Sequence, residues 1–305
     1  MKSQTPLVAV FMVTYNHSKY IAQAIESVLM QKTNFPLKLI IGEDYSTDKT
    51  REICIEYKNK FSDKIELILN EINLGPKLNA NRVFDMCFKS NAKYIALLEG
   101  DDYWTDPNKL QKQINFLESH SKYSICFHHV TIVNEQEEVI FIEKQPQNII
   151  YTQADFIYNN KKETRTCSMV FRSEFLPFPI PDWFFAVFAG DKFLKILLTE
   201  HGDAFIMKED MACYRLHPNS YWSSQNSRML KLRTNRNDDI LIKHFSHKYP
   251  KLRKKLMLVR KTRHLDNKKF PIKLFYSSKY YLKYFLPEID RFLDNIFNFT
   301  TKLLK

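Results

Sequence analysis

The chain has few glycines, no paired cysteine motif and no long uninterrupted apolar run. Five Gly among 305 residues argue against a repetitive or linker-rich protein. Five scattered Cys without a CxxC pair argue against a zinc site or a disulfide framework, so we expect small buried thiols in a reducing compartment. No apolar stretch approaches the roughly 20 residues of a membrane-spanning helix, and the run Val8–Val13 is too short and too early for a signal peptide. We therefore expect a cytoplasmic protein.

The residues that are abundant place the chain among globular proteins. The hydrophobic content is 44% and the aromatic content 14%, and the length suits one large domain or two small ones. The net charge of +12 is uneven, because residues 243–283 contain fourteen Lys or Arg and one acid. Residues 284–305 contain three basic and three acidic residues, so residues 1–242 carry a net charge of about −1. The basic character therefore belongs to one C-terminal segment.

Apolar runs alternate with helical repeats through the first 120 residues. Strands are predicted at 7–14, 37–41, 65–69 and 94–98, with helices ending near 29, 61, 90 and 119. Ser18 is the predicted cap of the first helix, and Thr47 or Asp48 that of the second. This alternation predicts an α/β fold with a Rossmann-like, mostly parallel sheet flanked by helices. The polar clusters 14–17, 43–48 and 99–102 each follow a strand, so we expect them to gather at one edge of the sheet.

The pattern changes after residue 120. Short strands are predicted at 123–134, 138–143, 167–171, 203–207 and 211–216, and helices at 152–159 and 190–200. From about residue 224 the chain is predicted to be mainly helical and basic.

The stretch Glu99-Gly100-Asp101-Asp102 ends the fourth predicted strand with two adjacent carboxylates. Such carboxylates repel each other and lose hydration, so a fold tolerates them where a cation neutralises them. Hard oxygen ligands suit Mg²⁺ or Mn²⁺, which bridge to phosphates. The alternative is a solvated Asp-Asp turn. The stretch favours a divalent metal and a diphosphate at the carboxyl end of the sheet.

Several motifs share their order and spacing with a known family. They are Val-Thr-Tyr-Asn at 13–16, Gly-Glu-Asp-Tyr-Ser-Thr-Asp at 42–48, Asn-Leu-Gly at 73–75, Glu-Gly-Asp-Asp-Tyr-Trp at 99–104 with Pro107 and Lys109, Gly-Asp at 190–191, and Tyr-Arg-Leu-His at 214–217 with Trp222 and Ser223. The chain resembles the family 2 glycosyltransferases, which are inverting enzymes of the GT-A fold. Within that family it resembles the bacterial branch that builds capsule, O-antigen and other surface polysaccharides.

The resemblance covers roughly residues 5–225 and implies a domain organisation. A GT-A domain is expected over 1–225, with a nucleotide-sugar half at 1–120 and an acceptor half at 121–225. A basic, mainly helical extension is expected over 226–305. The chain departs from the family pattern at Glu43, where many members carry Asp, and at Tyr45, where Gly or Ser is usual.

The resemblance also implies a role for each motif residue. Nucleotide contacts are expected from Thr14, Tyr15, Asn16, Glu43, Asp44, Asn73 and Asp101. Asp102 and His217 are the expected ligands of Mn²⁺ or Mg²⁺, and Asp191 is the expected general base. Trp104, Trp222 and Arg215 are expected to line the donor or acceptor pocket. Structural alternatives stay open: Asp191 could cap a helix, His217 could be a satisfied loop histidine, and the tryptophans could be merely buried.

The resemblance implies an enzyme that moves a sugar from a nucleotide sugar, expected to be a UDP-sugar, to a saccharide or lipid-linked acceptor. A catalytically silent nucleotide-sugar-binding or scaffold subunit is the alternative, and retention of Asp102 and Asp191 argues against it. No RNA- or DNA-binding module accompanies the basic segment, so nucleic acid is not an expected partner. A nucleotidyltransferase would usually carry a glycine-rich loop after the first strand, which residues 14–17 lack.

Basic and aromatic residues mix in the segment 243–285, as in proteins that lie on anionic membranes. We therefore expect either a peripheral position at the inner face of the cell membrane or a solvated helical extension that packs on protein. A homo-oligomer also remains open.

Overall fold

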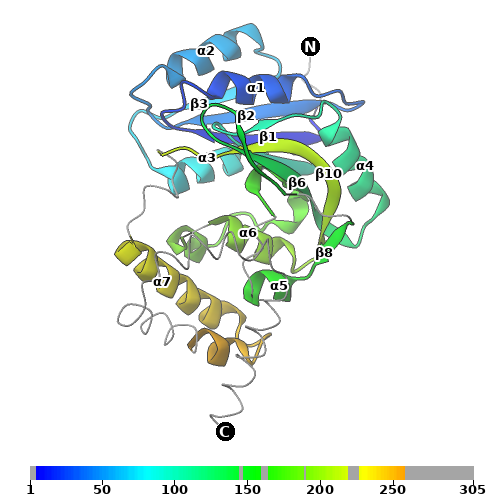
Figure 1. The fold of residues 1–305 in the computed structure, drawn as a ribbon, viewed down its shortest axis with the longest axis vertical. Coiled ribbons are helices and arrows are strands. Elements are labelled where there is room, and N and C mark those ends of the chain that lie inside the picture. Colours follow the sequence, from blue (N-terminus) through cyan, green and yellow to red (C-terminus); the bar gives the residue numbers. More distant parts are fainter. Residues whose placement is uncertain (1–4, 144–146, 159–163, 189, 219–226, 258–305) are drawn as a thin grey trace. The chain divides into compact units, whose positions relative to one another are not determined.

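A computed structural model describes residues 5–143, 147–158, 164–188, 190–218 and 227–257 (Figure 1). The chain forms two compact units, Met1–Leu241 and Ile242–Lys305. Helix α7 (Ser227–Phe245) contains the junction between them, whereas the domain boundary predicted at 225 stays a prediction. Residues 258–305, with most of the predicted basic extension, lie outside the described residues.

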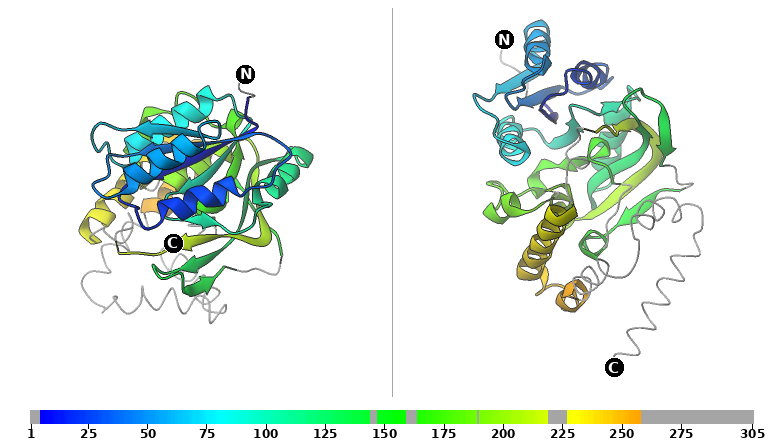
Figure 2. Two further views of the ribbon diagram at one scale, coloured as in Figure 1. Left: turned by 90° about the horizontal axis from the view of Figure 1, so that it is seen from above. Right: turned by 60° about the vertical axis from the view of Figure 1, so that its left-hand side comes forward.

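The first half of the chain builds a parallel sheet. Its elements are β1 (Val8–Thr14), α1 (Ile21–Leu29), β2 (Leu37–Glu43), α2 (Thr50–Lys60), β3 (Ile65–Leu69), α3 (Pro76–Lys89) and β4 (Tyr94–Glu99). The strand order is β3-β2-β1-β4, with all neighbours parallel. The chain moves outward from β1 to β3 and then returns past β1 to β4. Since such crossovers are right-handed, α1 and α2 cover one face and α3 the other (Figures 1 and 2).

The second half extends this sheet with mixed strands. Its elements are β5 (Tyr103–Trp104), α4 (Lys109–Ser119), β6 (Tyr123–Val133), β7 (Val139–Ile142), β8 (Ile149–Tyr151), α5 (Gln153–Tyr158), β9 (Val170–Arg172), α6 (Gly190–Leu198) and β10 (Asp203–Arg215), with 3₁₀ turns at Thr166–Ser168, Ser173–Phe175 and Asp182–Ala186. Strand β9 lies antiparallel between β4 and β6, and β10 runs parallel to β6. The two strands predicted at 203–207 and 211–216 are one strand. The polar residues between them form bulges around Asp210 that shift the register without ending the strand.

The predicted core is as the sequence indicates, whereas neither predicted cap is the N-cap residue, which is Tyr20 for α1 and Lys49 for α2. Strands β1 and β4 are almost entirely buried, and α1 packs its apolar side into the same core. Asp48 accepts a hydrogen bond from the Thr50 N–H at the start of α2, at 2.9 Å. The predicted cap at Ser18 is wrong: α1 begins at Ile21 without a side-chain cap, and the Ser18 N–H is bound to Asp48 at 3.0 Å instead.

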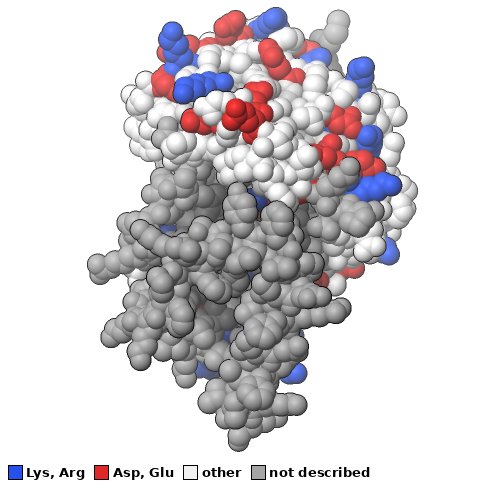
Figure 3. Space-filling view, in the orientation of Figure 1, with Lys and Arg blue, Asp and Glu red and all other residues white. Residues whose placement is uncertain are grey.

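The described surface shows no concentration of one charge on the face drawn in Figure 3, where acidic and basic side chains are interspersed. Within the described ranges, no helix combines the length and the apolarity needed to span a bilayer.

Candidate active site

The polar clusters that follow β1, β2 and β4 meet at one edge of the sheet, as predicted. The Gly100 N–H donates to the Val13 carbonyl at 3.0 Å, and the Asp44 N–H donates to the Thr14 carbonyl at 3.1 Å. Gly100 allows this approach, because a Cβ there would lie only 2.7 Å from the Thr14 hydroxyl oxygen. The strand order reverses between β1 and β4, and open α/β sheets bind ligands at such a point.

The loops after β1 and β2 are bound to each other. The Asn16 N–H donates to the Ser46 hydroxyl at 3.0 Å, and the Asn16 side chain accepts from the Thr47 N–H at 2.8 Å. Asn16 and Tyr45 both have a positive φ, 54° and 60°, which residues other than glycine adopt rarely. Tyr15 and Tyr45 expose 42% and 47% of their surface. The two rings are therefore available to stack on a planar ligand such as a nucleotide base.

The two acids at the end of β2 are bound within the protein. Glu43 is fully buried, and its carboxylate accepts from the Ser46 N–H at 2.7 Å and from Arg51 at 2.5 Å. Asp44 is 2% exposed, and its Oδ1 accepts from the Leu74 N–H and the Asn70 amide, both at 2.8 Å. Asn73 donates to the Asp44 carbonyl at 3.0 Å. These contacts join the loops that follow β2 and β3 around the predicted nucleotide residues.

Asp101 lies at the centre of a cluster with two histidines. Its Oδ2 is 3.0 Å from His217 Nε2 and 3.8 Å from His17 Nε2. One ligand atom from each of the three side chains lies within 4.8 Å of the others, which is compact enough for one metal ion. Burial alone would raise the pKa of Asp101, but the His217 hydrogen bond and the two imidazoles hold it below its ordinary value. Burial lowers the pKa of His17.

Asp102, which is buried, and Glu99, which is half-buried, flank this cluster. The Oδ1 of Asp102 accepts from the Arg215 N–H at 2.8 Å. The Asp102 carboxyl group also interacts with the Cys167 thiol, and the Glu99 carboxyl group with the Thr166 side chain. Burial and the carboxylates of Asp101 and Glu99 raise the pKa of Asp102 well above its ordinary value. Burial, followed by the charges of Asp101 and Asp191, raises the pKa of Glu99 to about 8. Neighbouring carboxylates that desolvation and mutual repulsion disfavour in this way fit a bound cation.

Arg215 and Trp104 are buried residues next to the acidic turn in the structure or the chain. Arg215 is 2% exposed, donates to the Asp101 carbonyl at 3.0 Å and to Gln23 at 2.6 Å. Trp104 is 1% exposed and donates to the Cys167 carbonyl at 2.8 Å, while the Lys109 ammonium lies 4.0 Å from its ring centre. Both residues are thus buried beside the acidic turn, and their expected place in the donor or acceptor pocket stays a prediction. Trp222 lies outside the described residues.

Asp191 lies in the first turn of α6, and 36% of its side chain is exposed. Its Oδ2 pairs with Lys195 one turn later at 2.9 Å. Burial opposes its ionisation, but the Lys195 charge and hydrogen bond hold the pKa of Asp191 below its ordinary value. Asp191 is therefore ionised at neutral pH, and its charge acts on Glu99 across the site.

The sequence had not selected His17 or Glu99 as site residues. His17 directly follows the Val-Thr-Tyr-Asn motif, and Glu99 is the first residue of the Glu-Gly-Asp-Asp-Tyr-Trp motif, but neither was assigned a role. Their polar side chains at the ends of predicted strands were the signal in the sequence that could have identified them as site residues. Glu99 lies two residues before Asp101 on the same strand end, whereas only the pairing of β1 with β4 brings His17 to Asp101.

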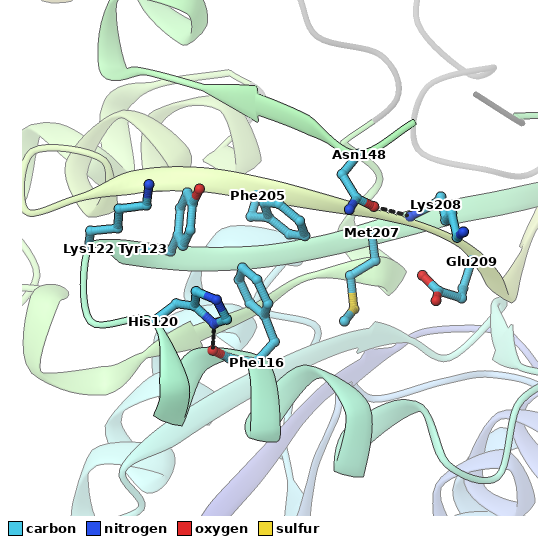
Figure 4. A pocket seen from close by; sticks show the side chains of 9 residues that line it. All are labelled: Phe116, His120, Lys122, Tyr123, Asn148, Phe205, Met207, Lys208 and Glu209. Carbon is cyan, nitrogen blue, oxygen red and sulfur yellow. Dashed lines mark hydrogen bonds between the residues drawn. The ribbon is translucent and has the colours of Figure 1, made fainter. Parts of the chain in front are cut away.

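A cleft of about 450 Å³ lies elsewhere on the domain (Figure 4). It is lined by the end of α4, the start of β6 and the first half of β10, where Phe116 stacks on Phe205 with ring centres 4.2 Å apart. None of the predicted site residues lines it. The candidate active site is therefore defined by the acidic turn.

Solved structures with this fold bind nucleotide sugars. S. aureus TarS 1-349 in complex with UDP-GlcNAc aligns with a TM-score of 0.55 at 17% identity, covering 78% of this chain and 72% of TarS 1-349. The mannosyltransferase PcManGT from Pyrobaculum calidifontis, in complex with GDP-Man and Mn²⁺, aligns with a TM-score of 0.50 at 14% identity, covering 93% of this chain and 82% of that protein. At these identities the likeness establishes the fold, which is GT-A.

Sequence comparison identifies the family. The Glycosyl transferase family 2 profile matches residues 9–176, and the chain belongs to this family. An uncharacterized protein of Mycobacterium tuberculosis is 32% identical over 214 residues, 70% of this chain. The matched part is 59% of that relative, so the chain spans less than two thirds of its length. The putative teichuronic acid biosynthesis glycosyltransferase TuaG of Bacillus subtilis is 34% identical over 117 residues, 38% of this chain and 44% of TuaG.

Proposed function

We propose that the protein transfers a sugar, with inversion, from a nucleotide sugar to a saccharide or lipid-linked acceptor in surface polysaccharide biosynthesis. The observation that carries the proposal is the acidic turn at the reversal point of the sheet, where Asp101 meets two histidines and the charge of Asp191 acts on Glu99. The relative TuaG supports a polysaccharide product, and TarS with UDP-GlcNAc supports a UDP-sugar.

The donor is proposed to bind along the loops after β1, β2 and β3. Tyr15 and Tyr45 offer exposed rings for the base, and Thr14, Asn16, Glu43, Asp44 and Asn73 shape the loops around it. Asp101 lies at the β4 end of this surface, where the ribose and diphosphate would follow. These residues bind and orient the donor and take no part in bond making.

The residues for a divalent ion are proposed to be Asp102 and His217, together with Asp101 and His17. Carboxylate oxygens suit Mg²⁺ and Mn²⁺ alike, whereas two imidazoles favour Mn²⁺. Such an ion, when bound, would neutralise negative charge on the leaving diphosphate.

Asp191 is proposed as the general base. An acceptor hydroxyl oxygen forms the new bond to the anomeric carbon while the bond from that carbon to the diphosphate oxygen breaks. The hydroxyl proton passes to the Asp191 carboxylate, and the nucleoside diphosphate leaves with the bonding electron pair. Attack from the face opposite the diphosphate inverts the configuration, as in displacement at a glycosidic centre. Lys195 orients the carboxylate.

The test is a panel of nucleotide sugars with Mn²⁺ or Mg²⁺, read out as release of nucleoside diphosphate and, separately, as Mn²⁺ binding by electron paramagnetic resonance. We expect one donor class to be turned over, and Asp102→Asn to weaken Mn²⁺ binding and abolish release. Asp85→Asn, an exposed acid on α3, is the matched control. Mn²⁺ binding unchanged in Asp102→Asn would contradict the metal assignment, and no release with any donor would favour the silent subunit.

A further inference from the structure

A second cleft, of about 150 Å³, gathers three cationic side chains. It is lined by Lys77 from the first turn of α3, by Arg233 and Arg236 from α7, and by Ala186 and Phe188. The two arginines are three residues apart and so lie on the same face of α7. None of these residues belongs to the acidic turn.

The charge of this cleft suits an anion. The pKa of Lys77 is lowered by partial desolvation and then by the charges of Arg236 and Arg233, so the three groups act on one another. Like charges held together are stabilised by an anion between them. Guanidinium groups present a planar fork of donors that matches phosphate oxygens, and lysine adds a point charge. The donors and charges of the cleft therefore suit a phosphate group.

Helix α7, which lines the cleft, is hydrogen-bonded to the segment that precedes the proposed general base. Asn237 of α7 accepts from the Phe188 N–H at 2.8 Å and donates to the Phe188 carbonyl at 2.5 Å. The Arg233 guanidinium lies 5.2 Å from the centre of the Phe188 ring. Phe188 precedes Asp191 by three residues, so α7, which carries the two arginines, is hydrogen-bonded to the segment that leads to the proposed base. Thr14–Asn16, Asp44 and Asp101, the proposed donor residues, do not line this cleft.

We propose that Lys77, Arg233 and Arg236 bind a phosphate group of the acceptor while its hydroxyl lies at Asp191. This inference rests on the proposed function. The phosphate belongs either to a phosphodiester polymer or to the diphosphate of a lipid-linked saccharide, since both present the same oxygens to the cleft.

Calorimetry with the full chain tests the cleft without turnover. A glycerol phosphate trimer represents the polymer, farnesyl diphosphate the lipid-linked acceptor, and UDP with Mn²⁺ the donor. Arg236→Gln and Arg233→Gln should each weaken the better of the first two probes about tenfold, as expected for one charged hydrogen bond, and Arg236→Lys should recover part of the loss. Lys89→Gln, which removes a cation at the other end of α3, should change nothing. Circular dichroism checks that each variant is folded.

The outcomes separate the possible sources of phosphate. A selective effect on the trimer identifies a phosphodiester acceptor, and a selective effect on farnesyl diphosphate identifies a lipid-linked one. An equal loss of UDP affinity would assign the cleft to the donor and overturn the proposal, as would unchanged binding or an equal effect of Lys89→Gln. Phosphate binding without donor turnover would count against the proposed function alone. Donor turnover without phosphate binding would count against the cleft alone.

Discussion

Asp191 is paired with Lys195 yet keeps 36% of its side chain exposed, so it is ionised and accessible, as a base must be. Asp191→Asn keeps the shape and the helical position but cannot accept a proton. We expect the transfer rate to fall by about 10²- to 10⁴-fold, the usual contribution of a general base. Donor affinity should be unchanged, because the base faces the acceptor. Asp182→Asn, an exposed acid on the preceding 3₁₀ turn, should retain the wild-type rate. A rate within threefold of wild type for Asp191→Asn would remove this residue from the mechanism.

Asp44 is the predicted contact to the nucleotide's base, and its carboxylate also accepts a hydrogen bond from the Leu74 N–H, so the choice of variant matters. Asp44→Asn keeps a carbonyl oxygen for the Leu74 N–H but loses the second acceptor oxygen. We expect UDP affinity to fall while kcat changes little, because a base contact acts equally in the ground and transition states. Titration calorimetry and steady-state kinetics measure the two effects, with the exposed Asp63→Asn as control. Unchanged UDP affinity would contradict the assignment.

The buried Lys109 makes the stability of the fold depend on pH. It is fully buried, and burial lowers its pKa to about 7, whereas an unfolded lysine titrates near pH 10.4. Between these values the unfolded chain binds more protons, so this residue makes the free energy of unfolding rise with pH, by at most about 1.4 kcal/mol per pH unit. Lys109→Met should flatten urea-unfolding stability between pH 7 and 9. The exposed Lys112→Met on the same helix should preserve the slope, and an equal slope in Lys109→Met would disprove the linkage.

At the scale of elements, the contact between the ends of β1 and β4 positions the acidic turn. A Cβ on Gly100 would lie 2.7 Å from Oγ1 and 2.8 Å from Cβ of Thr14, so Gly100→Ala must push the two strand ends apart. We expect a loss of about 1–3 kcal/mol in the free energy of unfolding, as for other overpacked positions. Gly190→Ala is the control, because its Cβ would meet Phe184 at an ordinary 3.6 Å. Equal stability of the two variants would show that the strand ends can separate freely.

At the scale of the whole molecule, the net charge of +12 is carried by residues 243–283, most of which lie outside the described residues. Each Lys or Arg near an anionic membrane contributes about 1 kcal/mol of binding. We expect the full chain to float with phosphatidylglycerol vesicles at low salt and to detach at high salt. A chain ending at Phe245, which keeps α7, should stay unbound. If both chains behave alike, the basic segment serves packing or solvation instead of membrane binding.

Much of this protein follows from its sequence alone. Continuous apolar runs such as Val8–Val13 and Tyr94–Leu98 are typical of buried strands, and their alternation with amphipathic helices predicts a parallel sheet. Because parallel strands end at one edge, the motifs after β1, β2 and β4 had to meet there. The spacing of the same motifs was enough to indicate the family.

Only the tertiary structure decided which motif side chains are buried and which charged groups they meet. Trp104 and Arg215 belong to the motifs, yet long-range hydrogen bonds to Cys167 and Gln23 draw them into the core. His17 reaches Asp101 because β1 lies beside β4, a pairing across more than eighty residues that local patterns do not encode. The cleft of Lys77, Arg233 and Arg236 depends in the same way on α7 packing against residue 188. Local sequence sets strands and helices, whereas contacts between distant segments set the environment of each charged group, and that environment determines its chemistry.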